Sequence, residues 1–282
     1  MALARAAFTL FLIGLPAMAH AAGGEGADDE SAAPSSRIAM AMNLYAGGIG
    51  LGKVDLDATI RGNQYHAVSN LETSGIVNAF WQARIQATSN GEILGNRLQP
   101  SLYDSFTTKK DSKQQVSLTY EPGGDIRIYA VPTYTLHDHP ITPEQQKNTY
   151  DPVSAILYVA SGIGGDAKNP CDVVAPVFDG RRRYDIEVKK EKDTTVDMDN
   201  GLYKGPAIQC TARYNQIAGF SQKVLDTNSS FPVLHAWVVT FPAAGGHNFV
   251  VPLRVWANTP YGVIAAVTST LKIDGVDKKM GG

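Results

Sequence analysis

Apolar and polar residues alternate with a period of two along most of the chain from residue 38 onward. This alternation is typical of β-strands that bury one face and expose the other. Turn residues separate several of these segments, and Pro122-Gly123-Gly124-Asp125 predicts a hairpin that returns along residues 126–131. The pattern therefore predicts a mainly β fold. The alternation is clearest over residues 38–44, 54–60, 116–120, 184–188, 208–214 and 251–255.

Two segments depart from simple alternation. Residues 76–88 fit either a helix or a strand, and we predict a strand because that template matches more apolar positions. Residues 234–241 are apolar at consecutive positions, so both faces of a strand there would be apolar. Such a strand lies at the centre of a sheet or lines an apolar groove.

One helix is predicted to interrupt the strands. Asp151 can cap its first turn, Pro152 suits its first position, and Gly162 can end it. A shorter helical turn is predicted to begin at residues 142–144. The apolar face of the main helix would consist of Val153, Ile156, Leu157 and Ala160.

The first residues have the features of an export signal. Arg5 precedes an apolar run over residues 6–15, and Ala19-His20-Ala21 offers small residues for cleavage. The run is too short to span a membrane as a helix. We expect a periplasmic protein with no transmembrane segment after cleavage. The predicted organisation is a signal peptide over residues 1–22, a flexible acidic linker over 23–36 and a single β-rich domain over 37–282.

Net charge does not indicate a nucleic-acid partner. The chain has 25 basic and 27 acidic residues. Without the one base of the signal and the four acids of the linker, residues 37–282 carry 24 basic and 23 acidic residues, a net charge of +1. Nucleic acids and anionic membranes select strongly basic surfaces. We therefore expect no nucleic acid among the partners.

Cys171 and Cys210 are the only cysteines in the chain. An even cysteine count in an exported protein predicts a disulfide. The two are not in a C-x-x-C arrangement, which favours a structural bond over a redox-active pair. We expect the bond to tie the connection after the helix to the strand that carries Cys210.

Other candidate chemistry is sparse. His137-Asp138-His139 offers two imidazoles, but zinc needs three or four ligands and His66, His235 and His247 are scattered, so we interpret the segment as a solvated turn. The chain has neither a Gly-x-Ser-x-Gly elbow nor a Gly-x-Gly-x-x-Gly segment that opens a helix after a strand. We predict no catalytic residue, no metal and no cofactor.

The run Arg181-Arg182-Arg183 is the densest cluster of charge. Guanidinium groups bind phosphate and carboxylate through planar sets of donors. Asp179 and Asp185 flank the run and can neutralise part of it. We interpret the run as structural ion pairing, and anion binding is the alternative.

Several segments of the C-terminal half form a recognisable set: Asp151-Pro152-Val153-Ser154-Ala155-Ile156-Leu157, Pro170-Cys171, Phe178-Asp179-Gly180-Arg181-Arg182-Arg183-Tyr184-Asp185, Tyr203-Lys204-Gly205-Pro206-Ala207, Cys210, Tyr214-Asn215-Gln216-Ile217-Ala218-Gly219-Phe220 and Val251-Pro252-Leu253-Arg254. With these segments, the C-terminal half resembles a family of bacterial envelope proteins known as domain of unknown function 3108. The resemblance implies a secreted protein built from a curved antiparallel sheet, a half-barrel or β-spiral, with one principal α-helix. It also implies a distant similarity to periplasmic lipoprotein carriers and to spiral-sheet envelope-integrity proteins, and it brings no catalytic residues.

These observations lead us to expect a non-enzymatic periplasmic protein that supports the cell envelope. It would bind a lipid, a lipoprotein or another envelope protein in a concave sheet, as the apolar strand over residues 234–241 suggests. The alternatives are a scaffold that binds proteins through an exposed strand edge and a hydrolase of unknown type. A deep apolar groove would favour the first, a long uncovered edge the second, and clustered carboxylates or histidines the third. The candidate binding residues are Trp237, Trp256, Arg181, Arg182 and Arg183.

Overall fold

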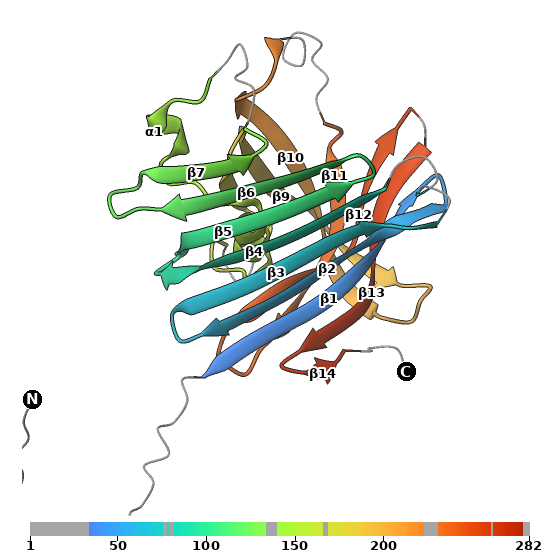
Figure 1. Ribbon diagram of the computed structural model, residues 1–282. Helices are drawn as coiled ribbons and strands as arrows, with labels where there is room; N and C mark the ends of the chain where they lie inside the picture. Colours follow the sequence, from blue (N-terminus) through green and yellow to red (C-terminus); the bar gives the residue numbers. More distant parts are fainter. Residues whose placement is uncertain are drawn as a thin grey trace, which may run out of the picture. The chain divides into compact units, whose positions relative to one another are not determined.

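The structure is a computed structural model that describes residues 34–75, 78, 82–133, 140–165, 169–222, 231–260 and 262–278. Its main feature is one antiparallel sheet that curves around a central helix (Figure 1). No helix among the described residues is long and apolar enough to cross a membrane. The mainly β architecture with one principal helix is the fold predicted from the sequence.

The chain builds this sheet as two meanders that meet in the middle. β1 pairs with β2 on one side and with β13 on the other, so the first and last long strands are neighbours. The two ends of the sheet, β7 and β8, do not pair with each other, and the sheet stays open. In order across the sheet, the strands are β7 (Ile126–Val131), β6 (Ser112–Tyr120), β5 (Arg97–Lys109), β4 (Ala83–Leu94), β3 (Gln64–Thr73), β2 (Ile49–Arg61), β1 (Ser35–Ala46), β13 (Gly262–Ile273), β12 (Asn248–Thr259), β11 (Leu234–Pro242), β10 (Lys204–Ala218), β9 (Arg183–Asp197) and β8 (Val173–Phe178), with β14 (Val276–Asp277) pairing with β13.

Helix α2 (Pro152–Ala160) lies against strands from both meanders, namely β3, β4, β5, β8 and β12. Asp151 caps it and Gly162 follows it with a φ of 65°, as predicted. The predicted apolar face is wrong at Ile156, which is 41% exposed. Because strands surround the helix on several sides, Ser154, Ala155 and Tyr158 are buried in addition to Val153, Leu157 and Ala160.

The shorter helix α1 (Pro143–Gln146) confirms the predicted helical turn. Thr142 caps it, and its hydroxyl and the Gln145 side chain form a reciprocal capping box. A salt bridge of 3.5 Å between Lys147 and Asp125 links the segment after α1 to the turn between β6 and β7. The connection between the two meanders is thus attached to the first of them before α2 begins.

The core is one continuous cluster that runs through the sheet and the helix. Alternation places every second strand residue in this cluster, which is the reason the period of two predicted the strands. Strand β11 lies between β10 and β12, which confirms the central position predicted for residues 234–241. The largest fully buried side chains include Phe178, Phe249, Ile38, Ile60, Leu118 and Leu157.

Several predicted boundaries need correction. β1 begins at Ser35, inside the segment predicted as linker. The predicted strand over residues 76–88 is confirmed from Ala83 but wrong at Asn78, which lies in a 3₁₀ turn; residues 76–77 and 79–81 lie outside the described residues. Strands β5 and β8 were not predicted, because a proline interrupts the pattern in each, Pro100 and Pro176.

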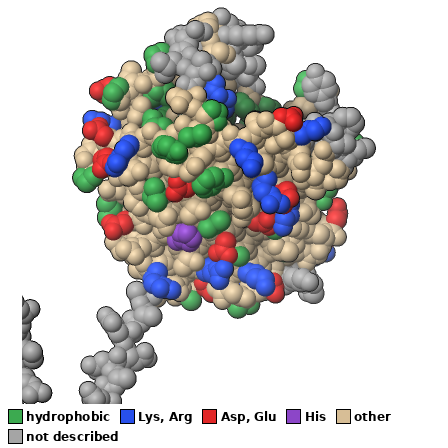
Figure 2. All heavy atoms as spheres, in the orientation of Figure 1, with side chains coloured by type: hydrophobic (Ala, Val, Ile, Leu, Met, Phe, Trp, Pro, Cys, Tyr) green, Lys and Arg blue, Asp and Glu red, His purple; other side chains and the backbone are tan. Residues whose placement is uncertain are grey.

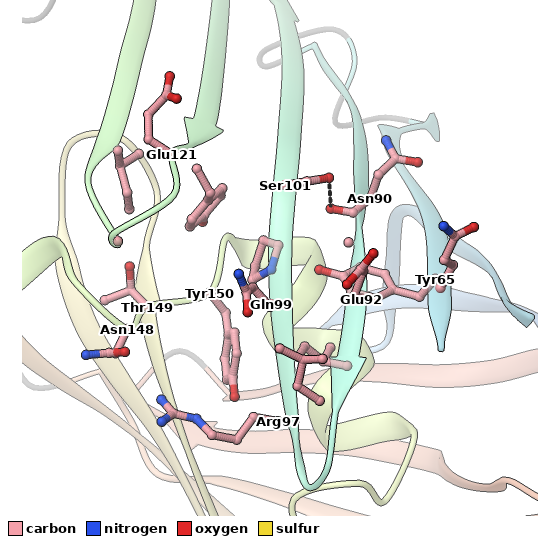
Figure 3. A pocket seen from close by; sticks show the side chains of 18 of the residues that line it. Tyr65, Asn90, Glu92, Arg97, Gln99, Ser101, Glu121, Asn148, Thr149 and Tyr150 are labelled. Carbon is pink, nitrogen blue, oxygen red and sulfur yellow. Dashed lines mark hydrogen bonds between the residues drawn. The ribbon is translucent and has the colours of Figure 1, made fainter. Parts of the chain in front are cut away.

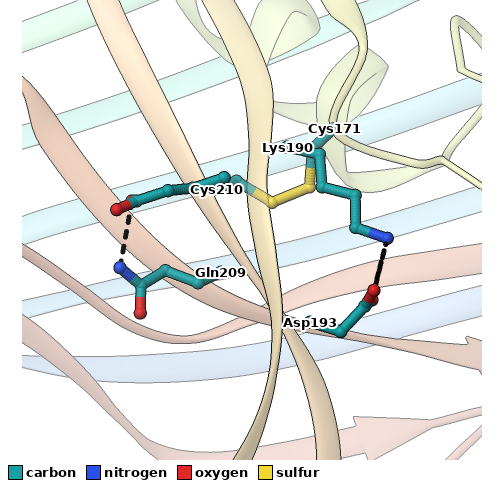
Figure 4. The surroundings of a disulfide bond; sticks show 6 residues. Cys171, Lys190, Asp193, Gln209 and Cys210 are labelled. Atoms are coloured by element: carbon teal, nitrogen blue, oxygen red, sulfur yellow. Dashed lines mark hydrogen bonds and ion pairs between the residues drawn. A yellow bond between two sulfur atoms is a disulfide. The ribbon is translucent and has the colours of Figure 1, made fainter.

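Cys171 and Cys210 form the predicted disulfide, with their Cα atoms 6.1 Å apart. Cys171 lies just before β8, and Cys210 lies on β10 opposite Lys190 of β9. The bond therefore crosses β9 and ties the segment after α2 to the third strand from that edge (Figure 4). Both cysteines are 1% exposed and pack with Val238 and Val250 in a small buried cluster.

Replacing Cys171 with Ser is expected to lower stability without abolishing the fold. The bond closes a loop of 39 residues, and losing a native bridge typically costs about 2–5 kcal/mol. The core cluster is far larger than that of a domain that depends on its disulfides. Thermal unfolding should shift downward and limited proteolysis should speed up between residues 148 and 183. Recovery of both cysteines as free thiols from exported protein would contradict the bond itself.

Candidate binding site at the mouth of the sheet

A cavity of about 1090 Å³ opens where strands β2 to β7 end on one side of the sheet. The segment Asn148–Tyr150, just before helix α2, forms the opposite wall (Figure 3). Asn148 has a φ of 57°, which turns the chain so that Thr149 and Tyr150 follow as part of the lining. A cavity of this size is in the range that holds small molecules or a short piece of a larger one.

Most of the residues that line this cavity, which we call the mouth cavity, are polar in type, although apolar atoms supply somewhat more of the lining surface than polar atoms do. Its apolar members are few: Leu94, Leu98, Pro100, Pro122 and Ile126. Aromatic rings, planar amides and charged groups supply most of the rest, namely Tyr65, Tyr120, Tyr150, Gln64, Asn90, Gln99, Asn148, Arg61, Arg97, Glu92 and Glu121. This composition differs from the apolar groove that the sequence led us to expect.

Gly91 allows the main chain of β5 and the Tyr65 side chain to pack closely against β4 in the wall of the cavity. It lies at a register shift between β4 and β5, where the pairing slips between Asn90 and Gly91. A Cβ atom at Gly91 would lie 2.3 Å from the carbonyl oxygen of Gln99 and 2.6 Å from the hydroxyl oxygen of Tyr65. Only glycine allows this approach, because each distance is far below van der Waals contact.

Beneath the cavity lies a buried polar network centred on Asp151. Its Oδ1 accepts hydrogen bonds of 2.9 Å from the backbone N–H groups of Val153 and Ser154. Its Oδ2 accepts hydrogen bonds from the hydroxyls of Ser154, at 2.6 Å, and Ser89, at 2.8 Å. The hydroxyl oxygens of Tyr65 and Ser154 are 2.8 Å apart, so the network reaches the lining of the cavity.

This network joins the helix to the sheet. Ser89 comes from β4 and Tyr65 from β3, while Asp151 and Ser154 belong to the first turn of α2. Asp151, Ser154 and Ser89 are fully buried, and Tyr65 is 3% exposed. Both carboxylate oxygens are occupied, so Asp151 holds the helix in place and is poorly suited to accept a proton from a ligand.

Burial governs the protonation of these groups. It raises the pKa of Asp151 above its ordinary value, and the four hydrogen bonds to the carboxylate offset only part of this rise. Burial also raises the pKa of Tyr65 and of Tyr120, and the nearby charge of Asp151 adds to both shifts. The tyrosines at the base of the cavity therefore remain neutral hydroxyls at physiological pH.

The predicted binding residues Trp237 and Trp256 lie outside the lining of the mouth cavity. Their rings contact each other, with centroids 5.0 Å apart, and the guanidinium of Arg254 lies over both, at 5.7 and 5.5 Å. His235 stacks on Trp256. These side chains form a ladder across β11 and β12 in which cross-strand pairs stabilise the sheet.

Polar contacts extend this ladder to two further strands. The Trp237 Nε1–H donates to Oε1 of Gln209 at 3.3 Å. Glu191 of β9 accepts from Gln209, and its Oε2 lies 3.0 Å from Nδ1 of His235. Ligand binding at Trp237 and Trp256 stays a prediction, and the contacts described show how their rings are held.

Arg181 and Arg182 of the arginine run lie in a turn, and Arg183 begins strand β9. Oδ1 of Asp179 accepts hydrogen bonds from the backbone N–H groups of Arg181 and Arg182, at 2.9 and 2.6 Å. The pKa of Asp179 is raised because burial outweighs the effects of these bonds and of the arginine charges. Asp179 thus shapes the main chain of the run.

Arg183 links β9 to α1 from a largely buried position. Its Nη1 lies 2.6 Å from Oδ1 of Asp185, as the predicted ion pairing requires, and its Nε donates to the Gln145 carbonyl oxygen at 3.1 Å. The Arg182 guanidinium lies 5.8 Å from the ring centroid of Phe220. None of the three arginines lines the mouth cavity, so binding of an anion by the run stays a prediction.

Among the described residues, no group of three or more histidine, cysteine, aspartate or glutamate side chains is placed to hold a metal. The segment His137-Asp138-His139 lies outside the described residues. The mouth cavity itself was missed by the sequence analysis, since its walls depend on β5. The Gly95-Asn96 turn between Leu94 and Arg97 is the signal that indicates a hairpin at this point.

An open antiparallel sheet that curls around one helix defines a barrel-like class of β protein, and such a fold does not fix a function. A family model described as "Protein of unknown function (DUF3108)" matches residues 40–268, and the chain belongs to this family. No curated protein matches the chain. A crystal structure of a beta-barrel-like protein of domain of unknown function DUF1849 from Brucella abortus is similar to it, with a TM-score of 0.49 and 11% identity over 86% of this chain and 99% of that chain.

Replacing Asp151 with Ala is expected to lower the free energy of unfolding by about 2–4 kcal/mol, because four buried donors lose their acceptor. Asn at the same position keeps an oxygen for the two backbone donors and should cost less.

The stability of the wild type should also depend on pH through Asp151. The raised pKa of Asp151 means that the native state holds the carboxyl proton more tightly than the unfolded state does. The wild type should therefore lose stability relative to Asp151→Asn as pH rises above about 4. Chemical denaturation at several pH values measures the cost of each substitution and its dependence on pH. If the difference in unfolding free energy between the wild type and Asp151→Asn is the same at every pH, the predicted pH dependence is wrong.

Replacing Gly91 with Ala is expected to displace Tyr65 and open the network below the cavity. The added methyl group must push aside either the main chain of β5 or the Tyr65 ring. We expect a loss of about 1–3 kcal/mol, as for other overpacked sites. Gly50→Ala is the matched control, since a Cβ atom there meets nothing within 4 Å. Equal melting temperatures for the two variants would show that the close approach at Gly91 is not needed.

Proposed function

We propose that this protein is a non-enzymatic periplasmic protein that supports the cell envelope. It binds a lipid, a lipoprotein or another envelope protein by inserting a polar part of that molecule into the mouth cavity. The observation that carries the proposal is a cavity of about 1090 Å³ whose base is held by a buried network. A site that is fixed before binding loses little conformational entropy when the ligand enters.

The polar side chains of the lining support binding of a polar group, and the apolar surface between them supports contact with the carbon atoms of that group. Planar amides and tyrosine hydroxyls offer donors and acceptors, and the rings of Tyr65, Tyr120 and Tyr150 offer flat apolar faces. Arg97 adds a positive charge, and no salt bridge ties its guanidinium to an acid among the described residues. Headgroups and peptide segments present the matching chemistry.

The contacts of Asp151 support a binding role over catalysis. A general base needs a free lone pair within reach of the substrate, whereas both oxygens of this carboxylate are used by the helix and by Ser89. Glu92 and Glu121 are the acids that line the cavity, and Glu121 pairs with Arg127. The signal-like segment over residues 1–22 and the disulfide support the periplasmic location.

Arg97→Ala combined with Gln99→Ala is expected to abolish ligand retention while leaving the fold intact. Both side chains line the cavity and are exposed, so their loss removes contacts to the ligand and few contacts to the core. Protein is purified from its own periplasm, and mass spectrometry identifies the lipids and proteins that accompany it. The wild type should start near Ala22 and retain a specific molecule that the double variant lacks.

Arg84→Ala is the matched control. Arg84 is also an exposed arginine of the β4–β5 region, but it pairs with Glu72 at 2.6 Å and does not line the cavity. This variant should retain the same molecule as the wild type. Equal retention by the double variant and the control would overturn the cavity as the binding site, and recovery of the uncleaved chain from the cytoplasm would overturn the location.

A further inference from the structure

The two edge strands of the open sheet, β7 and β8, differ in the pairing of their outer edges. At β8, the main chain of Tyr150 pairs with the outer edge: its N–H donates to the carbonyl oxygen of Pro176 at 2.7 Å, and its carbonyl oxygen accepts from Phe178 at 2.8 Å. At β7, the described part of the chain pairs only on the inner side, with β6. Among the described residues, therefore, no strand pairs with the main-chain donors and acceptors on the outer edge of β7, and such an edge can accept another strand.

β7 has few of the features that usually prevent such pairing, apart from its short length and the charge of Arg127. Edge strands are commonly protected by lysine, proline or bulges. The six residues Ile126–Val131 contain no lysine and no proline, and their pairing with β6 has no register shift. The one charge, Arg127, forms a salt bridge with Glu121 of the turn between β6 and β7. Ile128, Tyr129 and Val131 are 39%, 55% and 48% exposed.

The apolar surface continues from the edge into the sheet. The pairing of β5, β6 and β7 places Phe106 of β5 in line with Val131, and Asp104 in line with Tyr129. Phe106 and Leu102 are 49% and 38% exposed, which are large fractions for such side chains. Figure 2 shows hydrophobic side chains gathered over this part of the face.

A second copy of this chain fits the β7 edge best. In an antiparallel pair related by a two-fold axis at Ile128, Ile128 faces its own counterpart, and Ile126 faces Ala130 of the second copy. Arg127 then faces Tyr129 of the second copy, and the symmetry produces this favourable pair twice. An axis at Arg127 would instead bring two guanidinium groups together, which costs free energy.

We propose that two copies of this protein associate through β7, with their sheets joined antiparallel about a two-fold axis at Ile128. Six residues on each side make a small interface, so the dimer should be weak and reversible. The interface overlaps the mouth cavity at Ile126, the one residue of β7 that lines that cavity.

Cysteine cross-linking tests the arrangement directly. Residues that face each other across an antiparallel pair have Cα atoms about 4.5–5.5 Å apart, within the range of a disulfide. Ile128→Cys should therefore give a covalent dimer under mild oxidation. Arg127→Cys is the matched control, because its own counterpart would be about 8 Å away. Cross-linking at Tyr129→Cys instead of Ile128→Cys would overturn the register.

Charge replacement tests the association without cross-linking. Sedimentation of the wild type from about 1 µM to about 1 mM should show a dimer that grows with concentration. Tyr129→Lys places two positive charges opposite each other and should weaken the dimer at least tenfold. Adding Arg127→Glu to this variant converts the repulsion into attraction and should restore the dimer.

Val174→Lys is the control for a general effect of charge at a sheet end. Val174 is 51% exposed on β8, at the opposite end of the sheet from β7. This variant should associate as the wild type does. A wild type that stays monomeric over the whole range, or a dimer that Tyr129→Lys leaves unchanged, would overturn the proposal.

Discussion

The buried carboxylate of Asp151 is the contact on which the arrangement of this protein depends. It caps the one long helix and binds a hydroxyl of β4, so the helix can take only one depth and one rotation inside the sheet. That position in turn places Tyr150 where its main chain closes the β8 edge and its ring lines the mouth cavity. Burial removes water from the Asp151 carboxylate and thereby raises its pKa. This desolvation is the free-energy cost of fixing the helix, β4 and Tyr150 relative to one another.

Local patterns in the sequence were sufficient to predict the structure correctly where a residue's role depends on its near neighbours in the chain. The cap at Asp151, the proline after it and the glycine turn at residues 122–125 act within a few residues and were predicted correctly. The contacts of Asp151 with Ser89 and of Ser154 with Tyr65 join positions 62 and 89 residues apart. No periodicity reports such a contact, since it depends on how the helix enters the sheet.

In the candidate site, too, the sequence indicated the type of residue but not its contacts with residues far away in the chain. Trp237 and Trp256 were recognised as aromatic residues on an apolar strand, but the pattern does not tell which neighbours surround a ring. The structure places them in a ladder held by Arg254, Gln209 and Glu191. The mouth cavity collects polar residues from the ends of six strands and one loop, and residues at strand ends carry little periodic signal.

The neighbourhood of β1 and β13 has a consequence for the order in which the chain can fold. Ile38 pairs with Ile273, so the sheet is joined at its middle by residues 235 positions apart. A chain that is synthesised from its N-terminus presents β1 long before β13 arrives. One side of β1 therefore stays unpaired until β13 is available. The sheet can be completed only after the last long strand has joined it. Contacts of such high sequence separation make folding slow and leave partly folded chains open to aggregation.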